Sequence, residues 1–344
     1  MPATPTTYRA LVVRKSPERT FAAAVESLPV AELPAGEVTV RGHWSSLNYK
    51  DALTISGHPG VTRNFPHVPG IDVAGTVVAS DSDQFAPGDQ VIVTGFEFGS
   101  GRWGGYGELT RVPADWVVPL PSGLTAREAM VHGTAGFTAA QCVQAIQHEG
   151  ITPVDGPIVV TGASGGVGSL AVALLAKLGY HVAAVSGKPA AHDMLKRLGA
   201  AEILSRDAVD DANDKALLAA RWAGAVDTVG GNTLATLLRT TNIGGCVTAC
   251  GLVGGTDLKL TVYPFILRGV RLIGIDSAWI PKPRRAEIWA KLAGPWKLPG
   301  LDAITHELQL PDVAGAAQEM LAGRALGRSV VGLDAECGMR NAEA

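Results

Sequence analysis

The chain has 344 residues, of which 47% are hydrophobic and 18% charged, so it can bury two substantial cores and lacks the composition of a disordered protein. Its formal net charge is −3 and no run of Lys or Arg forms a basic patch, which argues against nucleic acid as a partner. The most apolar stretch, Leu170 to Ala176, is too short to span a bilayer and the N-terminus has no continuous apolar segment, so we expect no membrane association and a cytoplasmic protein.

The amino-terminal third of the chain alternates short strand-forming runs with turns, which predicts an all-β module. Pro87-Gly88-Asp89, for example, is a typical turn before the apolar run Val91-Ile92-Val93. The expected strands lie in residues 8–13, 36–44, 70–80, 87–95 and 107–121. From about Ala126, apolar residues recur at helical spacing, so a helix is expected to follow this module.

The middle of the chain contains a strand, a glycine turn, a helix and a second strand within PIVVTGASGGVGSLAVALLAKLGYHVAAVSGK. The helix, from about Ser169 to Leu178, is apolar on nearly all sides, as expected when a helix packs on a parallel sheet. Further strand-like segments follow in AAEILSRD, AGAVDTVGG, GGCVTACGL and VRLIGIDSAW, with helical PAAHDMLKRLG and TLATLLRTT between them. This alternation predicts a doubly wound α/β sheet, that is, a Rossmann dinucleotide-binding domain over residues 129–277.

The carboxy-terminal segment is predicted to return to the first domain. It contains two expected helices, RRAEIWAKLAG and VAGAAQEMLAG, and a strand-like RSVVGL. Residues 1–128, completed by 278–344, are therefore expected to form one β-rich domain. The strand-like stretch Val270 to Asp276 is expected at the edge of the Rossmann sheet. Pairing with a second copy would satisfy its exposed backbone groups, so we expect a homodimer.

The turn Ala163-Ser164-Gly165-Gly166-Val167-Gly168 follows an apolar strand and opens a helix, which is the setting in which a glycine motif binds a dinucleotide. Gly165 lets the backbone approach the pyrophosphate, and Gly168 lets helix and strand pack closely. The helix N-terminus supplies free N–H groups and the positive end of the helix dipole. Ala163 replaces the usual first glycine. The alternative interpretation is a purely structural turn.

The end of the second strand indicates which nicotinamide cofactor binds. An NAD site carries Asp or Glu about 20 residues after the glycine turn, to hold the ribose 2′-hydroxyl. This sequence has Ser186-Gly187-Lys188 instead, and no carboxylate lies between Tyr180 and His192. Ser186 can donate to a 2′-phosphate, Lys188 can neutralise it, and Arg206, after the next strand, is expected to be the second cation. We therefore expect NADPH.

The order of segments, a β-rich domain of the GroES-like kind followed by the ASGGVG turn, resembles the medium-chain dehydrogenase/reductase superfamily. Its zinc branch is expected to carry a ligating Cys near Leu47 to Lys50 and Gly-His-Glu where this chain has Gly70-Ile71-Asp72. A structural-zinc cysteine cluster is expected near residues 95–110, which contain no Cys. We assign no ligand role to the isolated histidines His58, His67 and His132. We therefore expect no metal, and reduction of an activated double bond rather than metal-assisted alcohol oxidation.

Six segments resemble the acryloyl-CoA reductase family, which is related to quinone oxidoreductases. They are HWSSLNYKDALTISG, RNFPHVPGIDVAGTV, WGGYGEL, MVHGTAGFTAA, VVTGASGGVGS and GGCVTACGLVGG. The resemblance implies NADPH-dependent conversion of acryloyl-CoA to propanoyl-CoA. It implies Tyr49 at the nicotinamide, Ser164, Gly165, Gly166 and Val167 at the pyrophosphate, Ser186, Gly187, Lys188 and Arg206 at the 2′-phosphate, and Leu252, Ile266 and Ser277 on the nicotinamide side. This chain has His192 where the family's aromatic Tyr would stack near the adenine, so that contact does not carry over.

The implied chemistry requires hydrogen-bond donors near the substrate. Hydride transfer to Cβ of the unsaturated thioester pushes negative charge onto the thioester oxygen, and a proton is then added at Cα. Without a metal, Asn48, Tyr49 and backbone N–H groups of their loop are the candidate donors. Tyr49 is also a candidate proton donor or, alternatively, a residue that packs on the cofactor. Candidate cations for the CoA phosphates are Lys50, Arg63, Arg102 and Lys282.

Two other functions fit the same sequence. The first is a zinc-free reductase acting on quinones or on free enals and enones, with the same cofactor chemistry and a different pocket. The second is a non-catalytic NADPH-binding protein, because a fold alone does not establish turnover.

Overall fold

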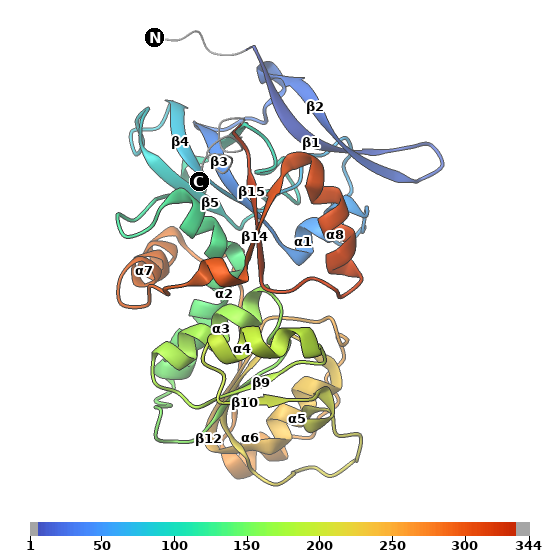
Figure 1. Cartoon of the computed structure of the whole chain (residues 1–344), viewed down its shortest axis with the longest axis vertical. Coiled ribbons are helices and arrows are strands. Elements are labelled where there is room, and N and C mark those ends of the chain that lie inside the picture. The colour runs from blue at the N-terminus through green and yellow to red at the C-terminus, as the bar shows by residue number, and fades with distance from the viewer. Residues whose placement is uncertain (1–5, 335–344) are drawn as a thin grey trace. The chain divides into compact units, whose positions relative to one another are not determined.

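Two units account for residues 6–334, the part of the chain that the computed structural model describes (Figure 1). In this range unit 1 contains residues 6–134, 278–295 and 305–334, and unit 2 contains residues 135–277 and 296–304. The boundary expected after residue 128 falls inside helix α2 (Ala126–His148), and the units separate just after the kink of this helix at Gly133. The segment 296–304, expected in the first domain, belongs to unit 2.

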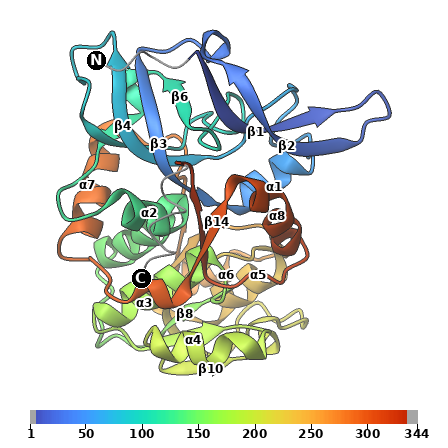
Figure 2. The same cartoon turned by 45° about the horizontal axis from the view of Figure 1, so that its top comes forward.

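A seven-stranded sheet forms the frame of unit 1, in the order β14-β15-β3-β4-β5-β7 with β6 also paired to β3. β1 and β2 form a separate antiparallel hairpin, and this hairpin and the neighbouring β3 and β4 can be followed in Figure 2. The strands are β1 (Thr7–Lys15), β2 (Phe21–Pro29), β3 (Val38–Leu47), β4 (Asp72–Ser80), β5 (Gln90–Thr94), β6 (Leu109–Val112), β7 (Val117–Pro119), β14 (Thr305–Gln309) and β15 (Arg328–Gly332).

The helices of unit 1 follow or cover this sheet. They are α1 (Tyr49–Ile55), α7 (Lys282–Ala293) and α8 (Val313–Leu321), with the 3-10 helices η1 (Val30–Glu32), η2 (Ala114–Trp116) and η6 (Leu310–Asp312). α1 packs against α8, and Val313 and Ala317 of α8 join the buried valines of the sheet in one core. The carboxy-terminal helices and the final strand were predicted, whereas α1, β2 and β14 were not.

Unit 2 is built on a six-stranded sheet in which every neighbouring pair is parallel, in the order β10-β9-β8-β11-β12-β13. The strand order runs outward in both directions from β8, so the predicted doubly wound sheet is confirmed. The strands are β8 (Ile158–Val160), β9 (Val182–Val185), β10 (Glu202–Leu204), β11 (Trp222–Asp227), β12 (Thr241–Ala249) and β13 (Arg271–Gly274). The helices are α3 (Gly166–Lys177), α4 (His192–Arg197), α5 (Gly231–Thr240) and α6 (Tyr263–Arg268), with η3 (Pro189–Ala191), η4 (Arg206–Val209) and η5 (Leu301–Ile304).

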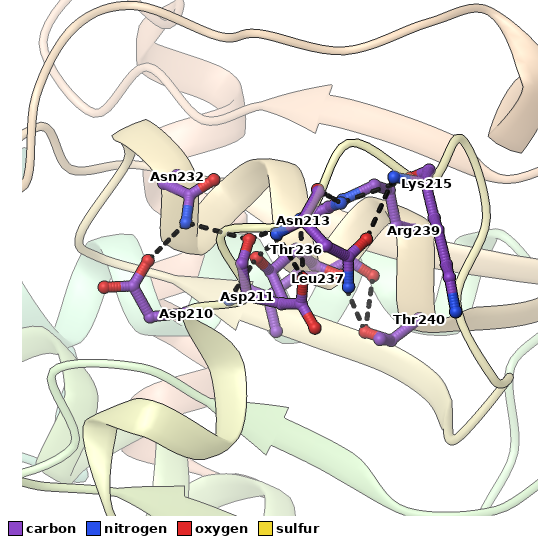
Figure 3. A network of polar contacts seen from close by, with 9 residues as sticks. All are labelled: Asp210, Asp211, Asn213, Lys215, Asn232, Thr236, Leu237, Arg239 and Thr240. Carbon is purple, nitrogen blue, oxygen red and sulfur yellow. Dashed lines mark hydrogen bonds and ion pairs between the residues drawn. The ribbon is translucent and has the colours of Figure 1, made fainter.

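The loop between η4 and β11 has little regular structure and is held by a buried arginine of α5 (Figure 3). Arg239 is only 6% exposed, and its guanidinium donates to the carbonyl oxygens of Asp211 at 2.7 Å, Asn213 at 2.6 Å and Lys215 at 3.2 Å. Asn232, also on α5, donates to the carboxylate of Asp210 at 2.5 Å. A single cation therefore satisfies three carbonyl groups of this loop, and the N–H of Leu218 donates in turn to the carbonyl oxygen of Arg239 at 3.0 Å.

We expect Arg239→Met to destabilise unit 2 by about 2–4 kcal/mol, because the substitution keeps most of the side-chain volume but leaves three carbonyl acceptors without their donor. Urea unfolding would measure the loss, and hydrogen exchange should rise first in residues 211–218. The matched control is Arg197→Met at an exposed position of α4, which should change stability by less than about 0.5 kcal/mol. Unchanged exchange in the loop would show that Arg239 does not hold it.

Candidate functional site

The glycine turn between β8 and α3 forms the first part of the site. Gly162 has φ +56°, and a Cβ there would lie 2.2 Å from Thr228 Oγ1, so this position requires glycine. A Cβ on Gly168 would lie 2.3 Å from the carbonyl oxygen of Gly162, so α3 starts in direct contact with the turn. The glycine in the left-handed conformation is thus one residue before Ala163, where the sequence pattern had been aligned.

The N-terminus of α3 offers backbone donors. Its N-cap is Gly165, which is extended and has no side chain to cap the helix, while Ser164 beside it is buried. The first N–H groups of the helix therefore have no side-chain acceptor, and the positive end of the helix dipole is left for an anion. These features fit the pyrophosphate of a dinucleotide at Ser164, Gly165, Gly166 and Val167.

The residues expected at the 2′-phosphate lie close together after β9 and β10. Ser186 is buried at the end of β9, and its N–H donates to the carbonyl oxygen of Leu204 at 3.0 Å, which ties the two strand ends together. A Cβ on Gly187 would lie 2.7 Å from Nε of Arg206, so the guanidinium lies directly over this glycine. Burial, and then the charge of Arg206, lower the pKa of Lys188. Two cations close enough to repel one another are a suitable site for a phosphate dianion.

The three residues expected on the nicotinamide side lie in different settings. Leu252 follows β12 and Ser277 follows β13, so both lie beyond carboxyl ends of parallel strands, at the same edge of the sheet as the glycine turn. Ile266 lies on α6, which connects these two strands. Leu252 and Ile266 are 63% and 68% exposed.

Asp227 at the end of β11 is a site residue that sequence reasoning missed. Its buried carboxylate accepts hydrogen bonds from Thr161 Oγ1 at 2.7 Å and from the N–H of Gly230 at 2.8 Å. It joins the turn after β8 to the turn after β11, the two strands between which the strand order reverses. The signal in the sequence is an Asp that ends the apolar strand WAGAVD directly before a Gly-Gly pair.

In unit 1 the candidate donors lie at the start of α1. Tyr49 is the first residue of the helix and its side chain is 43% exposed, whereas Asn48, the N-cap, is 8% exposed. The backbone N–H of Asn48 donates to Asp51 Oδ2 at 2.9 Å. Its side-chain Nδ2 donates to Asp72 Oδ2 at 2.8 Å and to Ser46 Oγ at 3.2 Å. Tyr49 is thus exposed at the surface of unit 1, whereas Asn48 is buried and held by its hydrogen bonds to Asp51, Asp72 and Ser46.

Asp72, the first residue of β4, is the centre of this buried network. Its carboxylate accepts hydrogen bonds from Ser46 Oγ at 2.6 Å, from Thr134 N at 2.8 Å and from Thr134 Oγ1 at 2.5 Å, in addition to the bond from Asn48. A Cβ on Gly133, which has φ +50°, would lie 2.5 Å from Asp72 Oδ2. Three strands or helices, β3, β4 and α2, therefore meet on one carboxylate.

Arg328, the first residue of β15, is buried beside this network. Its Nε donates to the carbonyl oxygen of Val131 at 2.7 Å and one terminal nitrogen lies 3.4 Å from Asn48 Oδ1. Burial lowers the pKa of Arg328, and the charge of Asp72 acts in the opposite direction. Arg328 therefore places a positive charge beside Asn48, the N-cap of α1.

Asp51, in the first turn of α1, carries a second buried carboxyl group. Its Oδ1 accepts from the N–H of Ile71 at 2.9 Å. Burial, followed by repulsion from Asp72, raises the pKa of Asp51 to about 7. Burial and the neighbouring Asp51 also raise the pKa of Tyr106 well above its usual range, so this phenol stays protonated and donates to the carbonyl oxygen of Ser46 at 3.1 Å.

The raised pKa of Asp51 predicts an unusual dependence of stability on pH. Because the folded pKa, about 7, lies above the unfolded value, the folded state binds the extra proton, so this group adds stability at low pH that is lost as pH rises to 7. We expect a loss of about 2–3 kcal/mol between pH 5 and pH 8 that is absent in Asp51→Asn. Urea unfolding of both proteins across this range measures it, and parallel pH curves would contradict it.

Of the four cations considered for CoA phosphates, Arg102 and Lys282 both contact η2, whereas Lys50 and Arg63 lie on or after α1. Arg102 donates to the carbonyl oxygen of Ala35 and lies 5.4 Å from the Trp116 ring. Lys282 donates to Gln84 Oε1 at 2.7 Å. Lys50 and Arg63 are exposed near the two ends of the segment that begins with α1. Within residues 6–334, no group of three or more His, Cys, Asp or Glu side chains is arranged to hold a metal ion, and no helix in that range is long and apolar enough to cross a membrane.

Comparison with known proteins gives the family. Residues 34–122 match the alcohol dehydrogenase GroES-like domain and residues 166–287 match the zinc-binding dehydrogenase domain. Acrylyl-CoA reductase AcuI of Ruegeria pomeroyi is 47% identical over 95% of this chain and 100% of its own length. The putative quinone oxidoreductase YhfP of Bacillus subtilis is 44% identical over 95% of this chain and 99% of its own length.

Solved structures of related proteins place the chain in the same family. The yhdH oxidoreductase of Salmonella enterica, in complex with NADP, has a TM-score of 0.92 and 51% identity, covering 95% of this chain and 100% of that one. The structure of YhfP with NAD bound has a TM-score of 0.93 and covers 96% of this chain and 100% of that one. The predicted fold class, a GroES-like domain and a Rossmann domain, is confirmed. The chain therefore belongs to the medium-chain dehydrogenase/reductase family, and within it to the group of acrylyl-CoA reductases related to quinone oxidoreductases.

Proposed function

We propose that this protein is an enzyme that reduces the carbon–carbon double bond of an α,β-unsaturated acyl thioester with NADPH, and that its substrate is acryloyl-CoA and its product propanoyl-CoA. The observation that carries the proposal is the identity of 47% with acrylyl-CoA reductase AcuI across that protein's whole length. This match includes both units, and so both the residues expected around the cofactor and those at the start of α1.

The residues of unit 2 favour NADPH over NADH. Relatives have been solved with NADP and with NAD, so the preference must come from this chain's own residues. Lys188 and Arg206 lie close enough to affect each other's charge at the end of β9, where an NAD site would have a carboxylate. A 2′-phosphate would be bound by both cations and by the hydroxyl of Ser186.

Bound NADPH would supply the hydride that adds to Cβ of the substrate. The protein must then stabilise negative charge on the thioester oxygen and deliver a proton to Cα. We assign the donor role to Tyr49, because its side chain is exposed at the first turn of α1. We assign Asn48 a second donor role. Its Nδ2 lies within hydrogen-bond distance of Ser46, Asp51 and Asp72, so it must give up one of these contacts to donate to the substrate.

The proposal is tested by following the loss of NADPH absorbance with acryloyl-CoA, beside NADH, a simple quinone and an enal at matched concentrations. Turnover of acryloyl-CoA with NADPH, and propanoyl-CoA as the product in mass spectrometry, would support it. Turnover of the quinone or the enal without the thioester would favour the rival reductase, which the similarity to the putative quinone oxidoreductase YhfP makes the second candidate. NADPH binding without turnover of any acceptor would favour a binding protein.

Tyr49→Phe tests the donor assignment. The substitution keeps the ring and removes only the hydroxyl, so we expect kcat with acryloyl-CoA to fall about 10- to 100-fold while the Kd for NADPH stays within about twofold. If Tyr49 instead packs on the cofactor, the phenylalanine variant will keep its kcat.

We also propose that the protein is a homodimer paired along β13. This strand is the last of its sheet, and α6 and the residue before it expose apolar side chains at Val262, Tyr263 and Leu267. An open strand edge beside apolar surface is suited to self-pairing across a two-fold axis. Light scattering should give twice the chain mass, and Leu267→Glu should give a monomer; a monomeric mass for the unmodified chain would reject the proposal.

Because NADPH and CoA thioesters are intracellular metabolites, we further propose a cytoplasmic location, which cell fractionation would test.

A further inference from the structure

A pocket of about 460 Å³ opens on unit 1 between the end of β1 and the segment that follows α1. This volume is in the range of small-molecule sites. Arg14 and Lys15 line it from the end of β1, and Ser16 and Pro17 line it from the turn that follows. Arg63 and Phe65 line it from the segment after α1. None of the residues assigned to the reaction in the preceding proposal lines this pocket, so it needs its own explanation.

The two walls of the pocket are joined by backbone hydrogen bonds. The N–H of Val13 donates to the carbonyl oxygen of His67 at 2.7 Å, and the N–H of His67 donates to that of Val13 at 3.0 Å. Phe65 packs against Phe21 of β2, with ring centroids 5.0 Å apart. The pocket is thus formed by segments that are hydrogen-bonded to one another, and its aromatic ring, Phe65, is held in place by its contact with Phe21.

The pocket is positively charged. Arg14 forms a two-pronged pair with Glu26, at 2.8 and 2.7 Å, which neutralises one of its three cations. In the described part of the chain neither Lys15 nor Arg63 forms an ion pair, and both are exposed. Arg63 donates through Nε to the carbonyl oxygen of Pro59 at 3.1 Å, which leaves its terminal nitrogens to bind an anion. A second carboxylate, Glu18, hydrogen-bonds to Ser16 of the pocket, so the three cations of the lining face two carboxylates and the pocket keeps a net positive charge. Two cations without an ion pair beside an aromatic ring match a phosphorylated nucleotide.

The pocket is connected to the start of α1 by the helix itself. α1 begins at Tyr49 and has seven residues, which corresponds to a length of about 10 Å. Gly57, just after the helix, has φ +74°, and a Cβ there would lie 2.3 Å from the ring of Phe21. The far end of α1 therefore lies against Phe21, whose ring packs on Phe65 of the pocket, so Tyr49 and the pocket lie toward opposite ends of one short helix.

We propose that this pocket binds the 3′-phospho-ADP end of the acyl-CoA substrate, with Lys15 and Arg63 on its phosphates and Phe65 against the adenine. The proposal rests on the thioester reductase function, because only then does the substrate carry this nucleotide. Arg63 is one of the four cations expected at the CoA phosphates, whereas Lys15 was not among them.

The first experiment is independent of turnover. Calorimetry would measure binding of 3′-phospho-ADP to the full-length protein saturated with NADPH, so that the cofactor site cannot take the probe. We expect the double variant K15Q/R63Q to bind at least about 30-fold more weakly, since each lost charge-assisted contact is worth about five- to tenfold or more. R41Q, at an exposed cation of β3 outside the pocket, should bind as the unmodified protein does. No binding, or equal loss in R41Q, would overturn the proposal.

The second experiment separates this proposal from the one on which it rests. KM would be compared for acryloyl-CoA and for acryloyl-pantetheine, which lacks the nucleotide. We expect K15Q/R63Q to raise KM for the CoA thioester at least about tenfold and to leave kcat and the values for acryloyl-pantetheine unchanged. Equal values in the variant and in the unmodified protein would overturn the pocket assignment while the reductase function stands. Absence of turnover with both thioesters in the unmodified protein would overturn the reductase function.

Discussion

The double substitution Lys188→Gln with Arg206→Gln should reduce kcat/KM for NADPH at least about 100-fold while changing that for NADH less than about threefold. The two residues lie at the ends of β9 and β10, with Arg206 directly over Gly187. Each cation would make a charge-assisted contact with the 2′-phosphate, worth about 1.5–3 kcal/mol, whereas NADH carries only a neutral hydroxyl at that position. The loss should therefore be specific to the phosphorylated cofactor.

The measurement is a set of steady-state rates with both cofactors, together with Kd values from the fluorescence of the bound nicotinamide. Lys196→Gln is the matched control, because Lys196 is an exposed cation on α4, a few residues beyond the proposed site. It should leave both cofactors unaffected. An equal loss with NADPH and NADH in the double variant would mean that Lys188 and Arg206 maintain the fold of this edge and do not select the phosphate.

Unit 2 could be predicted well from the sequence because its signals are local. An apolar strand, a glycine turn and an apolar helix follow one another within a short segment, and each reports its own structure. The gathering of Ser186, Lys188 and Arg206 could be predicted too, because ends of neighbouring parallel strands meet at one edge. Ala163 replaces the usual first glycine of the pattern, and the pattern does not reveal that Gly162, one residue earlier, is the residue with positive φ.

The network beneath α1 could not be predicted, because its members are distant in the chain. Asp72, Thr134 and Arg328 come from β4, α2 and β15, and nothing within a short sequence window links them. Gly70-Ile71-Asp72 was considered only for a zinc ligand, so the role of its carboxylate as an acceptor for Asn48 was not seen. β2 was missed for a similar reason: its side chains are only partly buried, and it is a strand because β1 pairs with it along its whole length.

Asp72→Asn should destabilise unit 1 by about 2–4 kcal/mol and lower kcat more than about tenfold. All four groups bonded to this carboxylate are donors: Ser46 Oγ, Asn48 Nδ2, and the N–H and hydroxyl of Thr134. An amide in its place would direct its own N–H₂ at one of these donors and would remove the negative charge beside the buried Arg328. Asn48 would then lose its firmest bond, and the first turn of α1, with Tyr49, would lose its anchor.

Urea unfolding at pH 7 gives the loss of stability, and steady-state rates with acryloyl-CoA give the loss of kcat. Asp83→Asn, at an exposed position, is the matched control and should change neither quantity. Because Asp72→Asn could fail to fold, Ser46→Ala provides a milder test: it removes one donor at 2.6 Å, and should cost about 1 kcal/mol and a smaller share of kcat. If both variants lose stability but keep kcat, the carboxylate of Asp72 only stabilises the sheet. If kcat falls in both variants, and further in the one that loses more bonds to Asp72, the network sets the position of the residues that meet the substrate.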